Sequence, residues 1–122
     1  MKSNELLNDK TFAFAVRIVE LHKTISDENK DDFMVTELVR SGTVQGARAR
    51  EVDYAQTFEE ALDALKSAQK ELTDARYWLE LVLNSVMISE DDFKSIDLDA
   101  QEILRLLTKA MLTHKQNLFN DN

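Results

Sequence analysis

The chain has 122 residues and a net charge of −8, with two glycines, no proline and no cysteine. This length suits one domain, residues 1–122, that can bury a core without cross-links, and the lack of cysteine excludes disulfides and zinc–thiolate sites. An all-β fold is excluded too, because its turns need proline and glycine. We therefore expect a few long helices joined by short polar links.

The first predicted helix runs from about Asp9 to Ser26. Four apolar residues recur every three or four positions and predict its buried face: Phe14, Ile18, Leu21 and Ile25. Four more widen this apolar stripe: Phe12, Ala15, Val16 and Val19. The acidic run 27–32 breaks the periodicity, so we expect a solvated turn before the next helix.

The second predicted helix begins near Asp31 and buries Met34, Val35, Leu38 and Val39. It then continues through both glycines of the chain, Gly42 and Gly46, which share one helix face. Each glycine costs about 1 kcal/mol relative to alanine, so the pair predicts a close approach, with Ala47 keeping the surroundings small. The approaching group is a helix of the same bundle, or alternatively another subunit or a ligand; a local helix break is the third alternative.

Three arginines make this segment the most basic stretch of the chain: Arg40, Arg48 and Arg50. Their planar guanidinium groups suit carboxylate and phosphate recognition. Because Glu37, Glu51 and Asp53 are near in sequence, we expect ion pairs within the chain or between subunits. Contact with an anion, with RNA or with another partner is the alternative.

The third predicted helix starts after a capping box at Thr57 and Glu60 and ends at about Met87. One apolar face persists for about seven turns: Phe58, Ala61, Leu62, Leu65, Ala68, Leu72, Ala75, Leu79, Val82 and Val86. Tyr77 and Trp78 are adjacent and must point in different directions. One is expected in the core and the other at its boundary, or alternatively one of them anchors an interface.

The fourth predicted helix follows Ser89 and the acidic residues 90–92, a typical helix start. Its buried face is predicted from eight residues: Phe93, Ile96, Ala100, Ile103, Leu104, Leu107, Met111 and Leu118. Long helices with short links favour antiparallel neighbours. The predicted fold is therefore an all-α, antiparallel up-down-up-down four-helix bundle.

The sequence contains few signs of a catalytic, metal-binding or cofactor-binding site. His22 and His114 are the only histidines, and neither belongs to the Glu-x-x-His motif of metal-binding bundles, so both are expected in the core or at its rim. The acids lie mainly at helix starts and on polar faces, and no glycine loop for phosphate or nucleophile elbow is present. We expect neither an enzyme, nor a metal site, nor another cofactor.

The charge distribution and the apolar pattern indicate whether the protein binds nucleic acid or membranes and where in the cell it is located. Residues 1–56 carry eight basic and ten acidic side chains, and residues 57–122 carry seven and thirteen. Such an acidic surface repels nucleic acid unless basic groups are concentrated locally. No apolar run has the length of a signal peptide or a membrane span, so we expect a cytoplasmic protein that does not bind membranes.

The segment from Arg40 to Gln56, RSGTVQGARAREVDYAQ, resembles the signature of the bacterial four helix bundle protein family, or 23S rRNA-intervening sequence protein family. Asp9–Leu21 and Leu62–Val82 are similar to the family as well, so the resemblance covers most of the chain. Arg48 stands where the family usually has asparagine, and Val44–Gln45 replaces a small polar residue followed by an apolar one. The resemblance implies a four-helix bundle that forms a ring, commonly of five subunits.

Two functions follow as hypotheses. The first is a homo-oligomeric scaffold or adaptor, a ring whose surface binds another protein. The alternative is an RNA or nucleoprotein accessory factor that binds through the arginine-bearing segment, and a small-molecule-binding bundle is a third class with no specific motif behind it.

Overall fold

The computed structural model describes the backbone of residues 2–120 and the side chains of residues 4–117. It contains four long helices, α1 (Lys2–Thr24), α2 (Phe33–Arg50), α3 (Phe58–Asn84) and α4 (Glu90–Asn120), and a short 3₁₀ helix, η1 (Glu51–Tyr54). No strand occurs among the described residues. The predicted all-α four-helix bundle is confirmed.

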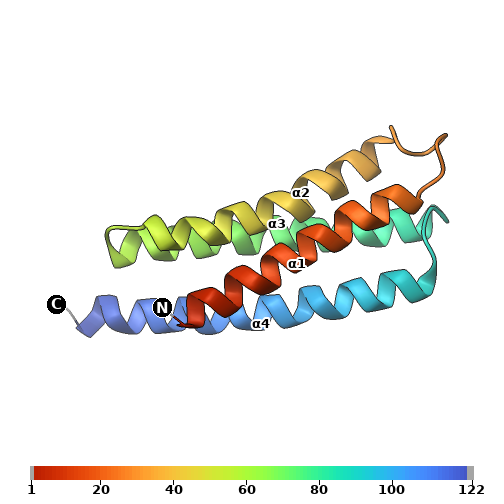
Figure 1. The fold of residues 1–122 in the computed structure, drawn as a ribbon. Coiled ribbons are helices and arrows are strands. Elements are labelled where there is room, and N and C mark those ends of the chain that lie inside the picture. Colours follow the sequence, from red (N-terminus) through yellow and green to blue (C-terminus); the bar gives the residue numbers. More distant parts are fainter. Residues whose placement is uncertain (1, 121–122) are drawn as a thin grey trace.

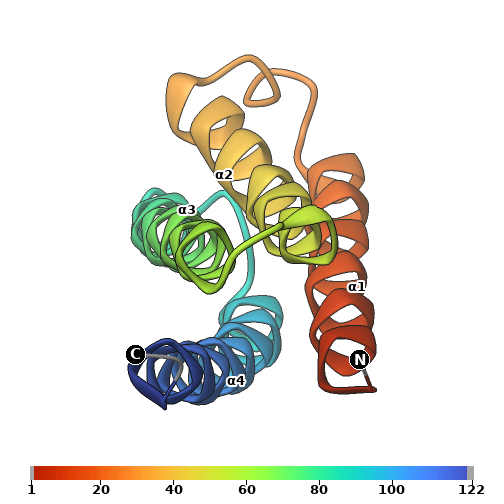
Figure 2. The ribbon, with the colours of Figure 1, turned by 90° about the vertical axis from the view of Figure 1, so that its left-hand side faces the viewer.

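Successive helices run in opposite directions (Figure 1). The α1–α2 link and the α3–α4 link therefore lie at the same end, which we term the loop end, while the α2–α3 link lies at the other. A view along the helices shows them around a shared interior (Figure 2), where α1 and α3 each pack on both α2 and α4. No helix in the described part of the chain combines the length and the apolar character needed to cross a membrane.

The core is built from one face of each helix. On α1 and just after it, the buried residues recur at heptad spacing: Leu7, Thr11, Phe14, Ile18, Leu21 and Ile25. Leucines dominate the other side of the interior, because Leu38, Leu65, Leu72, Leu79 and Leu107 are almost completely buried. Each such side chain contributes about 2 kcal/mol through burial, so packing, rather than helix propensity, sustains the bundle.

Helix α1 begins earlier than predicted. It starts at Lys2 instead of Asp9 and ends at Thr24 instead of Ser26. Leu7, one heptad before Phe14, is buried and extends the core face of α1 toward the N-terminus. Asn8 and Asp9 therefore lie within the helix and not at its start.

The helix starts follow the capping signals in the sequence. Asp32 accepts a hydrogen bond from the amide of Met34 at 2.8 Å and begins α2. Thr57 accepts from the amide of Glu60 at 3.0 Å, and the Glu60 carboxylate reaches back to the amide of Gln56 at 2.7 Å. Ser89 caps α4 by accepting from an amide in its first turn. Polar side chains thus satisfy amides that a helix leaves unpaired.

The end of α3 departs from the prediction. The helix stops at Asn84, because Val86 adopts a left-handed conformation with φ of 61°. The amide of Met87 then donates to the Val82 carbonyl at 3.1 Å, and the amide of Val86 donates to the Leu83 carbonyl at 2.9 Å. These two bonds form a Schellman motif. Val86 is 87% exposed, so the prediction that it belongs to the buried face is wrong.

The predicted faces of α2 and α4 agree better with the structure. On α4, Ile96, Ala100, Ile103, Leu107 and Met111 are buried, and Phe93 and Leu104 are half-buried. On α2, Val35 and Leu38 are buried, and Met34 and Val39 are half-buried. The prediction for Leu118 concerns a side chain outside the described residues.

Candidate interaction surface on α1 and α2

Both glycines of α2 face α1 of the same chain. Gly42 is buried, and a Cβ atom added there would lie 2.8 Å from Cγ1 of Ile18. A Cβ atom on Gly46 would lie 3.3 Å from the carbonyl oxygen of Thr11. The glycines therefore permit a close helix crossing inside the bundle, as in the first of the alternatives drawn from the sequence.

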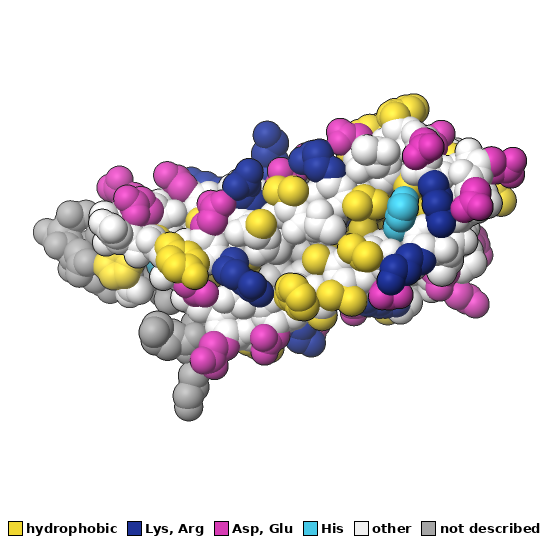
Figure 3. Space-filling model, turned by 45° about the horizontal axis from the view of Figure 1, so that its top comes forward, with side chains coloured by type: hydrophobic (Ala, Val, Ile, Leu, Met, Phe, Trp, Pro, Cys, Tyr) yellow, Lys and Arg dark blue, Asp and Glu magenta, His cyan; other side chains and the backbone are white. Residues whose placement is uncertain are grey.

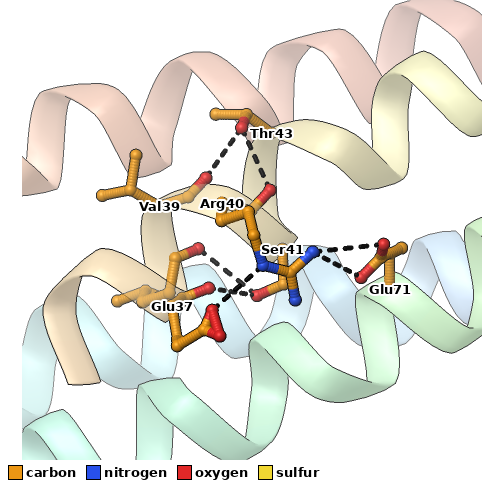
Figure 4. Close-up of polar contacts among 7 residues, drawn as sticks. Glu37, Val39, Arg40, Ser41, Thr43 and Glu71 are labelled. Carbon is orange, nitrogen blue, oxygen red and sulfur yellow. Dashed lines mark hydrogen bonds and ion pairs between the residues drawn. The ribbon is translucent and has the colours of Figure 1, made fainter. Parts of the chain in front are cut away.

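The polar residues of this crossing bind helix carbonyl groups. Ser41 donates to the Glu37 carbonyl and Thr43 donates to the Val39 carbonyl, each at 2.7 Å (Figure 4). Gln45 is completely buried, and its Nε2 donates to the Thr11 carbonyl of α1 at 2.8 Å. Its Oε1 has no hydrogen-bond partner among the described residues. Gln45 thus ties α2 to α1 at the point where the glycines bring them together.

Arg40 points away from α1, toward α3. Its Nε lies 3.0 Å from Oε2 of Glu37, and its Nη1 lies 3.3 Å from both carboxylate oxygens of Glu71 (Figure 4). The hydrogen bond with Glu37 is the main cause that raises the pKa of Arg40 above its ordinary value. Glu37 was an expected partner, whereas Glu71 is distant in sequence and could not be identified from local spacing.

Arg48 and Arg50 have different surroundings. Arg48 pairs with Glu51 at 2.7 Å. The Arg50 guanidinium carbon lies 5.6 Å from the centroid of the Phe12 ring, within the range of a cation–π contact. Asp53 accepts a hydrogen bond from Asn8 at 2.7 Å instead of pairing with an arginine. The three arginines consequently point to different neighbours instead of forming one basic patch.

A shallow groove runs between α1 and α2 and ends at η1. It has a volume of about 510 Å³, and we term it the α1–α2 groove; its lining is Phe12, Ala15, Thr43, Gly46, Ala47, Arg50, Glu51 and Tyr54. Ala47 is exposed and faces this groove, whereas Gly42 is buried in the helix crossing. The segment singled out in the sequence therefore has two sides, one packed on α1 and one facing solvent.

A second apolar face of α1 borders this groove. Phe12, Val16 and Val19 are between 41% and 57% exposed and follow one another at helical spacing. We term these three residues the outer α1 stripe. The sequence suggested that they widen the buried stripe, but the structure separates them from it. Hydrophobic side chains are visible along the middle of this face in the space-filling view (Figure 3).

Tyr77 and Trp78 lie on α3, away from the groove. Trp78 is half-buried against the core, and Tyr77 is exposed. Their ring centroids are 5.3 Å apart, and the Trp78 ring also meets Phe33 of α2 edge-on at 6.1 Å. The adjacent pair is thus divided between the core boundary and the surface, so the prediction that one of the two lies in the core is wrong.

The two histidines lie on different helices, His22 on α1 and His114 on α4. His22 is half-buried, and His114 is half-buried with its ring centroid 6.1 Å from that of Phe58. Nδ1 of His114 is buried and has no hydrogen-bond partner among the described residues. Within the same part of the chain, no three histidine, aspartate or glutamate side chains are grouped closely enough to hold a metal ion.

Comparison with known proteins shows similarity over most of the chain. A family model described as 23S rRNA-intervening sequence protein matches residues 5–109. A crystal structure of a protein of unknown function from the S23 ribosomal protein family of Bacteroides thetaiotaomicron is 37% identical, with a TM-score of 0.84. That similarity covers 89% of this chain and 97% of the other. No match was found among curated proteins.

Proposed function

Since the chain belongs to the 23S rRNA-intervening sequence protein family, we propose that it is a homo-oligomeric scaffold or adaptor without enzymatic activity. The family membership bears out the resemblance seen at Arg40–Gln56. The proposal is carried by one observation, the exposed apolar surface that the outer α1 stripe forms beside the α1–α2 groove. Contiguous exposed apolar surface of this kind is typical of protein–protein contacts.

A second copy of the chain is the proposed occupant of this surface. Residues 57–122, which contain α3 and α4, carry a net charge of −6, whereas residues 1–56, which contain α1 and α2, carry −2. Two copies that meet through α1 and α2 therefore repel each other less than copies that meet through α3 and α4. A ring of such copies, commonly five in the family, is the assembly that we propose.

The arginines favour this function over RNA binding. Arg40 and Arg48 are paired with carboxylates, which reduces their attraction for phosphate. A ring of five chains with a net charge of −8 each carries about 40 negative charges, and such a field opposes nucleic-acid binding. Both observations weigh against the RNA accessory role.

Light scattering tests the proposal directly. At micromolar concentration, we expect the wild-type chain to have the mass of an oligomer, and a Phe12→Glu, Val16→Glu variant to have the mass of a monomer. Both substituted positions are exposed in the single chain, so its helical circular dichroism should not change. Ala13→Glu is the control, because it adds a negative charge to the same helix at an exposed position outside the outer α1 stripe, although it adds one charge and the double variant adds two. A monomeric wild-type chain, or an equal effect of Ala13→Glu, would contradict the proposal.

A further inference from the structure

A second apolar cleft lies at the loop end of the bundle, on α3 and the α3–α4 link. It has a volume of about 800 Å³, and we term it the loop-end cleft. Tyr77, Leu81, Val86 and Ile88 supply apolar surface to it, and Glu80 and Glu90 supply carboxylates. It shares no lining residue with the α1–α2 groove, so the proposed contact between copies leaves it open.

Val86 gives the first indication of a role for this cleft. A valine with φ of 61° is strained, because its branched side chain meets the backbone there. The position follows a helix C-terminus, where glycine usually takes this conformation without strain. Since 87% of the valine is exposed, packing within the chain does not explain its presence. Strained residues of this kind concentrate at functional sites, and here the exposed group is an apolar side chain.

Aromatic side chains extend the apolar surface from the cleft toward α2. Tyr77 lines the cleft, Trp78 lies beside it, and Phe33 meets the Trp78 ring from α2. Phe33 and Tyr77 are 67% and 57% exposed. Aromatic residues with large exposed surfaces are frequent anchors in protein interfaces.

The surroundings of the cleft are acidic. Residues 80–92 contain Glu80, Glu90, Asp91 and Asp92 and no basic residue, and residues 27–32 of the other link contain four acids and one lysine. In the space-filling view, acidic side chains lie at this end with Lys and Arg side chains among them (Figure 3). The acids after Ser89 favour the start of α4, but Glu80 lies near the C-terminus of α3, where a carboxylate opposes the helix dipole. Arg76, one turn earlier on α3, attracts the Glu80 carboxylate and is the basic side chain on that side of the cleft.

We propose that the loop-end cleft binds a basic amphipathic segment of a partner protein. Apolar side chains of that segment enter between Tyr77, Leu81 and Val86, and its lysines or arginines face the carboxylates around them. Charge complementarity selects this occupant, because a second copy of an acidic chain, an anionic membrane and a nucleic acid would all be repelled. The inference rests on the adaptor role proposed above, but it does not require self-association.

The fluorescence of Trp78 can be used to measure peptide binding to the cleft. Trp78 is the only tryptophan of the chain, and its ring lies 5.3 Å from that of Tyr77 in the cleft. The ligand is a synthetic helical peptide without tryptophan, with leucines along one face and lysines on the other. We expect a saturable change in Trp78 emission that weakens with salt. A peptide with glutamates in place of the lysines should give no change.

Two variants locate the binding. Val86→Asn removes the apolar side chain and keeps a residue that tolerates the left-handed conformation, so the fold should persist while affinity falls about tenfold. Glu80→Gln should weaken binding and reduce its salt dependence. Leu112→Asn is the control, because Leu112 is an exposed apolar residue of α4 that lies outside the cleft and should leave the affinity unchanged.

The outcomes separate this inference from the proposed oligomer. Wild-type affinity in both Val86→Asn and Glu80→Gln, or no binding at low salt, would overturn the inference. A lower mass of Val86→Asn in light scattering would overturn it as well, because the cleft would then be a contact between copies. Peptide binding by a monomeric wild-type chain would leave the cleft supported and refute only the oligomer.

Discussion

Arg76 of α3 holds Asp97 of α4 through two hydrogen bonds. Its Nε lies 2.8 Å from Oδ1 and its Nη2 lies 3.1 Å from Oδ2, while Gln101 Nε2 donates to Oδ2 at 2.9 Å. Asp97 is only 9% exposed. The hydrogen bond with Arg76 is the main cause that lowers the pKa of Asp97 below its ordinary value. This paired geometry fixes α3 against α4 about two helical turns from the loop end.

Removal of this carboxylate should destabilise the fold. We expect Asp97→Asn to lower the free energy of unfolding by about 2 kcal/mol at neutral pH, because Arg76 loses a charged acceptor. Urea unfolding measures the change. The matched control is Asp99→Asn, which removes the more exposed Arg17–Asp99 pair and should cost less than about 0.5 kcal/mol. Equal costs for the two variants would contradict the special role of Asp97.

The Arg76–Asp97 pair also predicts that the free energy of unfolding depends on pH. Because the pKa of Asp97 is lower in the folded than in the unfolded state, its stabilising contribution is fully present above the unfolded-state value of about 3.9. It is lost as the pH falls through the lowered folded-state pKa. The difference in unfolding free energy between wild type and Asp97→Asn should therefore shrink in acid. A difference that stays constant down to the lowest accessible pH would argue against this titration.

The contact between Gly42 and Ile18 can be tested by a double-mutant cycle. Gly42→Ala should destabilise the fold by about 1 kcal/mol, because the steric penalty exceeds the gain in helix propensity. In an Ile18→Ala background the added methyl group has room, so the same substitution should become stabilising. Thermal unfolding of the four proteins gives the coupling. Additive effects would show that the two residues do not limit how closely α1 and α2 approach.

Because the amide of Gln45 is buried, we expect a charged side chain at this position to destabilise the fold strongly. Gln45→Glu keeps the shape but places a carboxylate beside the Thr11 carbonyl, and we expect a loss of more than about 3 kcal/mol at neutral pH. Acid should recover part of this loss, because burial favours the protonated form. Gln45→Met lacks both the hydrogen bonds and the unpartnered oxygen, so it should change stability by less than about 1 kcal/mol. A well-tolerated Gln45→Glu would contradict this account.

The strain at Val86 predicts a stabilising substitution. Val86→Gly should raise the free energy of unfolding by about 1 kcal/mol, since the relief of strain exceeds the added flexibility of the unfolded chain. The melting temperature should rise by roughly 4 °C. Ser85→Gly is the control, because Ser85 has φ of −85°, so glycine relieves no backbone strain there. Equal shifts in both variants would indicate a general effect of glycine in this link.

The sequence predicted the four helices and most of their core residues, because helical periodicity and capping signals are local. It also named Glu37 and Glu51 among the acids near the arginines, without assigning each to an arginine, and both form ion pairs within one helical turn. It missed Glu71 as a partner of Arg40, since that contact depends on how α2 is aligned with α3. The exposure of the outer α1 stripe was missed for the same reason: only the arrangement of neighbouring helices decides which apolar face is covered.

Val86 was misplaced for a different reason. Its spacing continues the buried face of α3, and no glycine or proline marks the end of that helix. The helix ends because Val86 adopts the left-handed backbone conformation, which valine rarely takes. A periodic pattern therefore located the core but not the point at which the chain leaves it.

An even number of antiparallel helices returns the chain to the end at which it started. Helix α1 begins and helix α4 ends at the opposite end from the loop end (Figure 1). A fluorescent protein, an affinity handle or a surface tether joined beyond either helix would consequently stand far from the loop-end cleft. Immobilised on a sensor through either terminus, the bundle would present Val86 and its acidic surroundings to the solution.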